Sequence, residues 1–295
     1  MSAAAAKVVV VTGANSGIGR AAAVHLAAAG HTVYGTMRDL AKGDKLLAKA
    51  ADVGAIVNTV ALDVADDDSV ASGMEQILHA EGHVDVLINN AGVGMNAVLE
   101  EVDIEAAKDV FDVNYFGIVR CTQAVLPTMR ERRTGTIVNI SSIAGRLAAL
   151  AQVIYASSKW AVECLSENLA QELAPWNIKV RMIEPGVTRT ALLAKHTDLN
   201  EGSPYADAYR RMFAFYMAGI EAGVGADVVA QTIAGAIDDP SDRLRYVCAY
   251  GGEELGSGRD GVSDADWVAL GAAGSDEEYF ERFRSAFGLD IAPST

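Results

Sequence analysis

Short runs of β-branched residues alternate with longer stretches of helical composition, and this alternation constrains the fold more than any other feature of the chain. It is typical of βαβ units that build one parallel sheet with helices on both faces. The predicted strands are 8–12, 32–37, 58–62, 84–89, 136–141, 179–184 and 243–250. The predicted helices are 18–29, 67–81, 104–130 and 157–174. Because proline lacks a backbone N–H, Pro127 should kink or loosen the third helix. The sequence therefore predicts an α/β fold with a doubly wound, parallel, seven-stranded sheet.

Two regions fall outside this alternation, 191–223 and 251–295. The first places Tyr205, Tyr209, Met212 and Tyr216 on one face of a helix. Such a stripe either packs on the sheet or covers an apolar substrate pocket, and the sequence leaves both readings open. We predict a single dinucleotide-binding catalytic domain at 1–250, with a helical substrate lid at 191–223 and a C-terminal extension at 251–295.

Composition excludes several classes of function. The chain has 24 basic and 39 acidic residues and a formal charge of -15, which repels a phosphate backbone, so nucleic acid is not expected as a partner. Charged residues interrupt every stretch long enough to cross a bilayer, and the first residues lack a signal peptide's basic start. We therefore expect a cytoplasmic protein with no membrane span. The cysteines and histidines show neither CxxC nor HExxH spacing, and we expect no metal site.

A glycine-rich turn follows the first predicted strand and opens the first predicted helix. The free N–H groups and the dipole of such a helix suit a pyrophosphate, and glycines let the backbone approach it closely. The spacing is GxxxGxG, which by itself is also compatible with an ordinary tight turn. The candidate binding residues in the turn are Gly13, Asn15, Ser16, Gly17, Ile18 and Gly19.

Five further motifs follow the turn in order. They are Asn89-Asn90-Ala91-Gly92, Asn114, Ser142, Tyr155-Ala156-Ser157-Ser158-Lys159 and Pro185-Gly186-Val187-Thr188-Arg189-Thr190. Together they resemble the classical short-chain dehydrogenase/reductase family, and the stretch 86–193 is similar to hydroxysteroid and retinol dehydrogenases. The resemblance covers about 7–190 and implies a Rossmann-like fold and hydride transfer between a nicotinamide and a carbonyl or secondary alcohol.

The resemblance also implies a role for each matching residue. Tyr155 would be the acid/base, Lys159 would bind the nicotinamide ribose, Ser142 would bind the substrate oxygen, and Asn114 would complete a proton relay through water. The implied cofactor-binding residues beyond the glycine-rich turn are Asp63, Val64, Asn90, Ala91, Gly92, Tyr155, Lys159, Pro185, Gly186, Val187 and Thr190. Simpler readings stay open, since Asn114 suits a buried structural amide and Asn89 to Gly92 suit a turn that ends a strand.

The spacing of the tyrosine and lysine supports this chemistry. A free tyrosine, with a pKa of about 10, is a poor acid-base catalyst near neutrality. Lys159 follows Tyr155 by four residues on a predicted helix, so both side chains emerge on one face. A neighbouring ammonium favours the phenolate, and we therefore expect a lowered pKa for Tyr155.

The end of the second predicted strand bears on the choice between NADP(H) and NAD(H). A 2'-phosphate prefers a guanidinium, whereas a ribose hydroxyl prefers a carboxylate. Arg38 and Asp39 give opposite indications. We favour NADP(H), because Asp39 is better explained as the cap of the segment that begins at Leu40.

The sequence thus predicts an NADP(H)-dependent oxidoreductase that acts on a small apolar ketone, aldehyde or alcohol, and a homodimer or homotetramer paired through 104–130 and 157–174. One alternative is a reductase of 3-oxoacyl thioesters on a carrier protein, with Arg130, Arg132 and Arg133 as a docking patch. Another is a catalytically silent protein that senses NADP(H).

Overall fold

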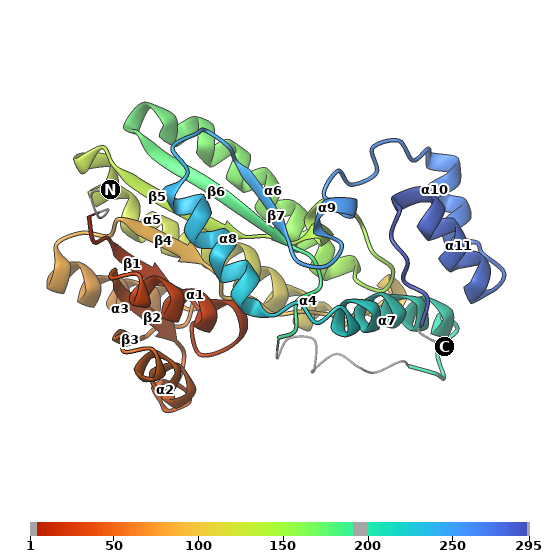
Figure 1. Ribbon diagram of the computed structural model, residues 1–295, viewed down its shortest axis with the longest axis horizontal. Helices are drawn as coiled ribbons and strands as arrows, with labels where there is room; N and C mark the ends of the chain where they lie inside the picture. Colours follow the sequence, from red (N-terminus) through yellow and green to blue (C-terminus); the bar gives the residue numbers. More distant parts are fainter. Residues whose placement is uncertain (1–4, 191–199, 294–295) are drawn as a thin grey trace.

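The computed structural model describes residues 5–190 and 200–293. Seven parallel strands form one sheet in the order β3-β2-β1-β4-β5-β6-β7 (Figure 1). The strands are β1 (Val8–Val11), β2 (Thr32–Met37), β3 (Val57–Ala61), β4 (Val86–Asn89), β5 (Gly135–Ile140), β6 (Ile178–Pro185) and β7 (Arg245–Cys248). The prediction of a seven-stranded parallel sheet is confirmed.

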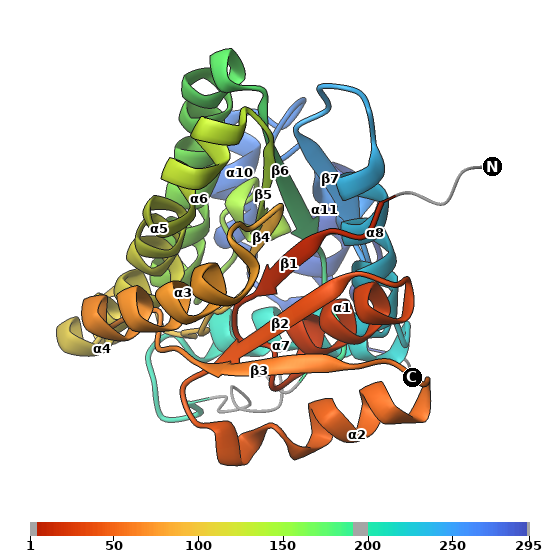
Figure 2. The same cartoon turned by 90° about the vertical axis from the view of Figure 1, so that its left-hand side faces the viewer.

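Helices cover both faces of the sheet, as Figure 2 shows in a view across the layers. One face carries α1 (Gly17–Ala28) and α8 (Ala226–Asp238), and the other carries α3 (Asp67–Glu81), α5 (Gly117–Arg132) and α6 (Val153–Leu173). The short α2 (Asp44–Asp52) lies beside the β3 edge. This arrangement is the doubly wound, Rossmann-like fold that the sequence predicts.

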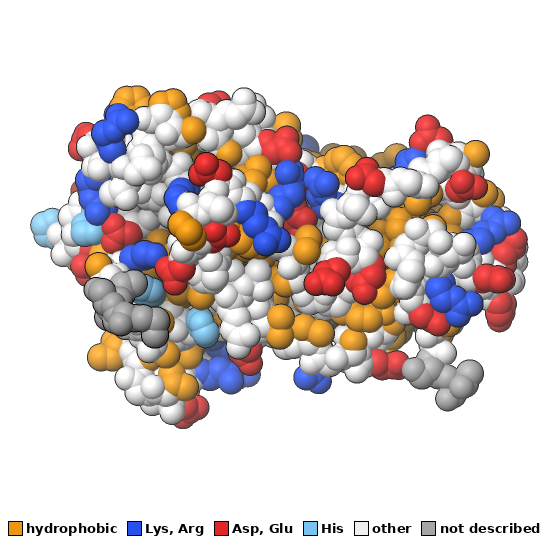
Figure 3. Space-filling model, turned by 45° about the horizontal axis from the view of Figure 1, so that its top comes forward, with side chains coloured by type: hydrophobic (Ala, Val, Ile, Leu, Met, Phe, Trp, Pro, Cys, Tyr) orange, Lys and Arg blue, Asp and Glu red, His pale blue; other side chains and the backbone are white. Residues whose placement is uncertain are grey.

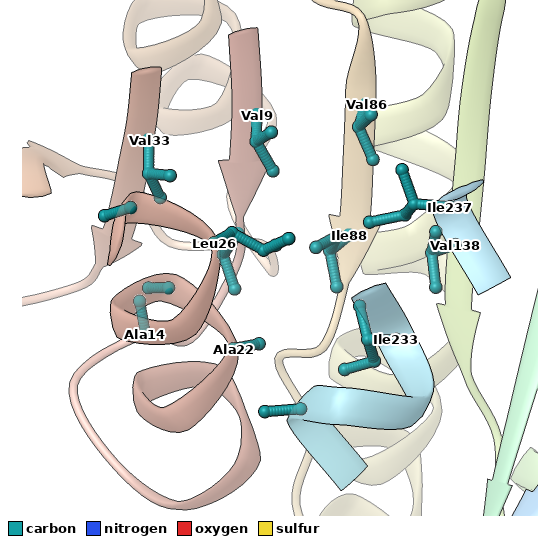
Figure 4. Close-up of a cluster of buried hydrophobic side chains, with 14 of the residues drawn as sticks. Val9, Ala14, Ala22, Leu26, Val33, Val86, Ile88, Val138, Ile233 and Ile237 are labelled. Atoms are coloured by element: carbon teal, nitrogen blue, oxygen red, sulfur yellow. The ribbon is translucent and has the colours of Figure 1, made fainter. Parts of the chain in front are cut away.

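Valine-rich strands explain why the sheet is buried on both sides. All four residues of β1 are buried, and alternate side chains point to opposite faces. Figure 4 shows Val9, Val33 and Ile88 of the sheet packed against Leu26 of α1 and Ile233 of α8. Contacts of this kind bury apolar surface at roughly 25 cal/mol per Å². The core therefore fixes α1, and with it the turn that opens α1.

The predicted helix at 104–130 is wrong as a single element. The chain forms α4 (Ile104–Phe111), then a π-helical turn at Asp112–Phe116, and then α5, which continues past Pro127 to Arg132. A π turn adds one residue to the helical ladder and is frequent at functional sites. Here it contains the fully buried Asn114. The irregularity therefore sets the position of a candidate site residue.

The C-terminal part of the chain builds a second, smaller layer of helices beyond the carboxyl ends of the strands (Figure 1). It consists of α7 (Ala206–Glu221), α9 (Gly252–Leu255), α10 (Asp264–Gly271) and α11 (Asp276–Phe287). Within the predicted lid, 191–199 lie outside the described residues. Arg211 of α7 is buried, donates to Asp276 over 3.0 Å and lies 5.0 Å from the Tyr279 ring centroid, so α7 and α11 are joined.

The sheet order reverses between β1 and β4, and open α/β sheets bind ligands outside the carboxyl ends of strands at such a point.

Short helical turns connect the remaining elements, at Leu40–Lys42 (η1), Leu99–Glu101 (η2), Ile143–Gly145 (η4) and Ala174–Trp176 (η5). Figure 3 shows acidic and basic side chains interspersed over one face of the molecule. In the described part of the chain, every helix is too short or too polar to cross a membrane.

Candidate active site

The glycine-rich turn between β1 and α1 is shaped by close backbone approaches. Gly13 and Gly17 have φ of 66° and 51°, in the left-handed region that favours glycine. A Cβ at Gly19 would lie 2.3 Å from Asn90 Nδ2 and 2.6 Å from the Gly13 carbonyl oxygen. Ser16 precedes α1 in extended conformation and makes no side-chain hydrogen bond to cap the helix. The backbone of the turn can therefore approach a pyrophosphate, as the sequence predicts.

The turn is tied to the segment that follows β4. The Thr12 hydroxyl accepts hydrogen bonds from the backbone N–H groups of Asn90 (2.9 Å) and Ala91 (3.0 Å), and Asn90 Nδ2 donates to the Thr12 carbonyl (2.8 Å). Two motifs that are far apart in the sequence thus form one rigid rim at the β1/β4 reversal. The sequence is compatible with Asn90 and Ala91 as cofactor contacts or as a turn. In the structure both residues link this segment to the glycine-rich turn.

One cavity of about 970 Å³ opens beside this rim and extends to the C-terminal helices. It brings together nearly all of the candidate residues. Those that line it are Gly13, Asn15, Ser16, Gly17, Ile18, Arg38, Asp63, Val64, Asn90, Ala91, Gly92, Ser142, Tyr155, Lys159, Pro185, Gly186, Val187 and Thr190. Gly19 and Asn114 are not on its surface but lie next to Asn90 and Gly92, which are.

Tyr155 and Lys159 emerge from the first turns of α6 into the middle of the cavity. Lys159 Nζ lies 5.8 Å from the centre of the Tyr155 ring and donates to the Ile140 carbonyl over 2.8 Å. Ser142, just after β5, hydrogen-bonds Tyr155 and also accepts from the Ala144 N–H at 3.1 Å. Both predictions about α6, one helix and one face, are confirmed. A substrate oxygen at this place could contact a phenol and a hydroxyl together.

The pKa of Tyr155 does not follow the sequence-based expectation. Burial raises the pKa of the phenol, and the hydrogen bond from Ser142 opposes this shift. Burial also lowers the pKa of Lys159 to about 8, with Glu163 acting in the opposite direction. The expected lowering at Tyr155 is wrong because desolvation outweighs the hydrogen bond with Ser142.

Asn114 is held by backbone rather than by the cavity. Its Oδ1 accepts from the Val93 N–H (2.8 Å), and its Nδ2 donates to the Val93 carbonyl (2.9 Å) and to Ser158 Oγ (3.1 Å). A Cβ at Gly92 would lie 3.3 Å from this Oδ1 and 3.9 Å from Lys159 Nζ. The Asn114 amide therefore lies near Lys159, but its hydrogen bonds are those of a buried structural amide, which is the alternative left open by the sequence.

The far end of the cavity, beside β2, bears on the cofactor's ribose. Arg38 is exposed and lines the cavity together with Lys42. The Asp39 carboxylate accepts from the Ala41 N–H at 3.0 Å, which caps η1, and lies 3.8 Å from Lys42. The prediction that Asp39 is a helix cap is confirmed. Two cations and a carboxylate that is already engaged suit a phosphate at this position.

The opposite end of the cavity is apolar and comes from α7 and the C-terminal helices. Its side chains include Leu147, Met212, Phe215, Leu255, Trp267, Leu270, Phe283 and Ile291. The Phe215 ring centroid lies 6.4 Å from that of Phe283 and 6.3 Å from that of Tyr250. Of the aromatic stripe, Met212 and Tyr216 line the cavity, whereas Tyr209 packs with Ala151, which lies before α6 and not in the sheet.

A polar cluster next to Tyr155 was missed by sequence reasoning. Gln152 Nε2 donates to Tyr216 Oη, and Tyr216 Oη lies 3.2 Å from Asn96 Oδ1. All three residues line the cavity, and burial and the charge of Tyr155 raise the pKa of Tyr216. These residues come from three distant segments, so only the spacing of Tyr216 within its helix gave any signal.

The residues suited to a metal ion are dispersed. Across the described ranges 5–190 and 200–293, no three His, Cys, Asp or Glu side chains are grouped as ligands. The cavity is instead suited to a dinucleotide, since glycine backbone, two cations and a buried tyrosine–lysine pair follow one another along it.

The sequence model of the family described as "short chain dehydrogenase" matches residues 7–201, which is well over half of the chain. The chain belongs to the short-chain dehydrogenase family. It is 40% identical over 210 residues to a 3-ketodihydrosphingosine reductase of Bacteroides thetaiotaomicron, covering 70% of this chain and 74% of that protein. It is 43% identical to human retinol dehydrogenase 8 over 65% of this chain and 62% of that protein. It is 36% identical to mouse 17-beta-hydroxysteroid dehydrogenase type 1 over 81% and 72%.

Solved structures of this family share the fold. A short-chain dehydrogenase from Streptomyces avermitilis matches with a TM-score of 0.76 and 35% identity, over 91% of this chain and 96% of that one. Actinorhodin polyketide ketoreductase with NADPH matches at 0.72 and 30%, over 83% and 96%. A Burkholderia phymatum family member in complex with NAD matches at 0.72 and 28%, over 83% and 89%. Both cofactor types therefore occur among the structural neighbours.

Proposed function

We propose that this short-chain dehydrogenase is an NADP(H)-dependent oxidoreductase that interconverts an apolar ketone or aldehyde and its alcohol. The observation that carries the proposal is one continuous cavity with cations at one end, Ser142, Tyr155 and Lys159 in the middle and apolar side chains at the other. The named substrates of three relatives, a ketodihydrosphingosine, a retinol and a steroid, agree with that apolar end.

The proposed chemistry assigns one task to each polar side chain. Bound nicotinamide would supply hydride to the carbonyl carbon or accept it from the alcohol carbon. Tyr155 donates its phenolic proton to the substrate oxygen during reduction and takes a proton back during oxidation. Ser142 hydrogen-bonds the same oxygen, and the Lys159 ammonium stabilises the phenolate. Asn114 completes a proton path to water beside Lys159.

NADP(H) is the proposed cofactor because of the residues at the β2 end. Arg38 and Lys42 would hold the 2'-phosphate, and Gly13, Gly17 and Ser16 would receive the pyrophosphate. Asp63 would lie near the adenine amino group and Val64 along the adenosine ribose and the dinucleotide, and Pro185 to Val187 with Thr190 would flank the nicotinamide. Asp39 also lines the cavity, but its Oδ1 is engaged by the Ala41 N–H as the cap of η1, which supports the phosphate reading.

The thioester alternative loses one of its supports. The proposed docking arginines lie at the end of α5, next to the start of β5, whereas the cavity lies at the carboxyl ends of the strands. Arg132 bonds Asp85 at 2.8 Å, and Arg133 donates to the Pro175 carbonyl at 2.6 Å. These side chains thus have structural partners, far from the place where a carrier would deliver its thioester.

The test follows oxidation of NADPH and of NADH with ketones that range from small aliphatics to steroids and long-chain ketones. The wild type should reduce bulky apolar ketones with NADPH, and Tyr155→Phe should lower kcat by about a thousandfold, in the range of general acid catalysis. Fluorescence titration should show unchanged NADPH binding in the variant. If only carrier-bound 3-oxoacyl thioesters were reduced, the thioester reductase would be favoured. If no substrate were turned over, the silent NADP(H)-sensing protein would be favoured.

We also propose a homodimer or homotetramer paired through the outer faces of α5 and α6. Phe116, which caps α5, and Trp160 of α6 are large apolar side chains exposed on the single chain. Mass measurement in solution tests this pairing, and a monomer of the wild type would refute it.

A further inference from the structure

Two carboxyl groups are buried directly behind the proposed catalytic lysine. Glu163 lies one helical turn after Lys159 on α6, and Glu184 is the residue before Pro185, which ends β6. Their side chains are 7% and 1% exposed. Buried carboxylates are rare unless each one is paired and hydrogen-bonded. The mechanism proposed above uses neither of them.

A single guanidinium faces both groups. Arg245 Nε of β7 lies 3.0 Å from Glu163 Oε2 and 3.0 Å from Glu184 Oε1, but its one N–H donates to Glu163. The Arg245 Nη2 is engaged by Glu167, over 2.6 Å. Glu163 Oε1 and both oxygens of Glu184 accept no hydrogen bond from the described residues. Two ionised carboxylates would leave three buried oxygens unsatisfied, at a cost of about 1–3 kcal/mol or more for each.

A proton shared between the two carboxyls reduces that conflict, because it joins one oxygen of Glu184 to one of Glu163 in a hydrogen bond. The charged and titratable groups that face the pair are Lys159 and Glu167 of α6, Arg146 just after η4, and Arg245 and Cys248 of β7. Burial and the charge of Glu163 raise the pKa of Glu184 to about 7, against the opposite effect of Arg146 and Arg245. Glu184 therefore carries the proton, since Glu163 alone accepts the Arg245 N–H.

The remaining negative charge lies next to Lys159. Burial lowers the pKa of Lys159, and the Glu163 carboxylate is the one group that raises it again. The Lys159 ammonium otherwise donates to the Ile140 carbonyl, which is neutral. A fixed anion one turn along α6 thus favours the charged form of a lysine in an apolar setting.

We propose that Glu163 and Glu184 form a proton-sharing pair in which Glu184 holds the proton and Glu163 stays ionised and keeps Lys159 charged. Both are positioning residues that act through Lys159. The expected effect on catalysis rests on the proposed role of Lys159. The shared proton and the charge of Lys159 can be tested without that role. The matched control is Glu167, which binds the same arginine but is 53% exposed.

The proton is tested by infrared spectroscopy of the whole protein as a function of pH. The wild type should show a protonated carboxyl band at pH 6 that is lost above neutrality. Glu184→Gln should abolish the band and Glu167→Gln should retain it. A wild type without the band, or a band that survives in Glu184→Gln, would overturn the shared proton.

The charge of Lys159 is tested by its acylation rate, measured by mass spectrometry after brief exposure to an amine-reactive ester. Lys159 lines the cavity, so a small reagent can reach it. Glu163→Gln should lower the Lys159 pKa from about 8 by about one unit and so accelerate acylation about fivefold at pH 7. Glu163→Asp should restore the wild-type rate, and Glu167→Gln should not change it. Equal rates in Glu163→Gln and Glu167→Gln would overturn the inference, whether or not any ketone is turned over.

If the enzyme is active, its pH profile supplies a third readout. In the direction of alcohol oxidation, Glu163→Gln should displace the rise of kcat with pH upward by about one unit, since a less charged Lys159 stabilises the phenolate less. Glu184→Gln should leave that rise in place. A parallel fall in kcat at every pH, with no displacement, would indicate a merely structural role.

Discussion

The cofactor end of the cavity is shaped mainly by backbone, whereas the substrate end is shaped by side chains from segments far apart in the sequence. At the cofactor end, Gly13 and Gly19 leave no room for a Cβ, and Thr12 and Asn90 fix the rim through hydrogen bonds between side chain and main chain. At the substrate end, Phe215 of α7 meets Phe283 of α11 through ring contacts. The cofactor end should therefore tolerate almost no substitution, and the substrate end should respond gradually.

The largest effect is expected from Gly19→Ala. The added Cβ would lie 2.3 Å from Asn90 Nδ2 and 2.6 Å from the Gly13 carbonyl, so the rim must shift. Strain of about 1–3 kcal/mol weakens NADPH binding by about 5- to 150-fold. The measurement is a fluorescence titration with NADPH.

The matched control is Gly235→Ala in α8, where a Cβ meets nothing within 4 Å. Replacing glycine by alanine inside a helix should stabilise the fold by about 1 kcal/mol and leave NADPH binding unchanged. Equal binding in both alanine variants would show that the rim is not set by this close approach.

Arg38→Ala should have a smaller and selective effect. A guanidinium that binds a phosphate contributes about 1.5–3 kcal/mol, and because Arg38 is exposed we expect the lower limit, about a tenfold loss of NADPH affinity. NADH affinity should stay the same, because NADH has no 2'-phosphate. Parallel titrations with the two cofactors decide the matter, and an equal loss for both would contradict the phosphate role.

Phe215→Ala should change substrate selection at the other end of the cavity. Phe215 lines the cavity and contacts Tyr250 and Phe283, so its removal lessens apolar contact without touching Ser142 or Tyr155. We expect KM for bulky ketones to rise about tenfold, since burial of a phenylalanine side chain contributes a free energy of about 1.5–3 kcal/mol. KM for a small aliphatic ketone should stay within about twofold. A uniform rise for all ketones would mean that α7 positions the catalytic centre instead.

The same difference explains which features could be predicted from the sequence. The strands, the parallel sheet and the glycine-rich turn depend on local patterns, because β-branched runs and glycine spacing are determined by backbone geometry. The cap role of Asp39 was likewise visible, since capping acts over two or three residues. Nearly all candidate residues consequently line one cavity.

The features that were missed depend on tertiary contacts. The π turn that holds Asn114 divides a helical pattern that is continuous in sequence. The pKa of Tyr155 depends on burial, which the spacing of Tyr155 and Lys159 does not contain. The cluster of Tyr216, Gln152 and Asn96 joins three segments that only the folded chain brings together.

The smallest effect concerns the ion pairs that join α7 to α11. Arg210 and Arg211 both donate to Asp276, and these bonds lower the pKa of its carboxyl below the ordinary value. A carboxyl with a lowered pKa in the folded state contributes stability above its unfolded pKa, and this contribution is lost as pH falls through the folded pKa. The contact is therefore complete at neutrality and should weaken only in acid, below the ordinary carboxyl range.

Amide exchange of α11, corrected for the intrinsic effect of pH, measures this contact. In the wild type we expect protection that is constant from neutrality to about pH 5 and then falls. Asp276→Asn should reduce protection about twofold to fivefold at neutrality, in line with a partly exposed ion pair, and should remove the decline in acid. Glu281→Gln, at an exposed position of α11, is the control and should behave as the wild type. If Asp276→Asn retained the acid-dependent decline, another carboxyl would be its source, and the ion pairs of Asp276 would not be the pH-dependent contact between α7 and α11.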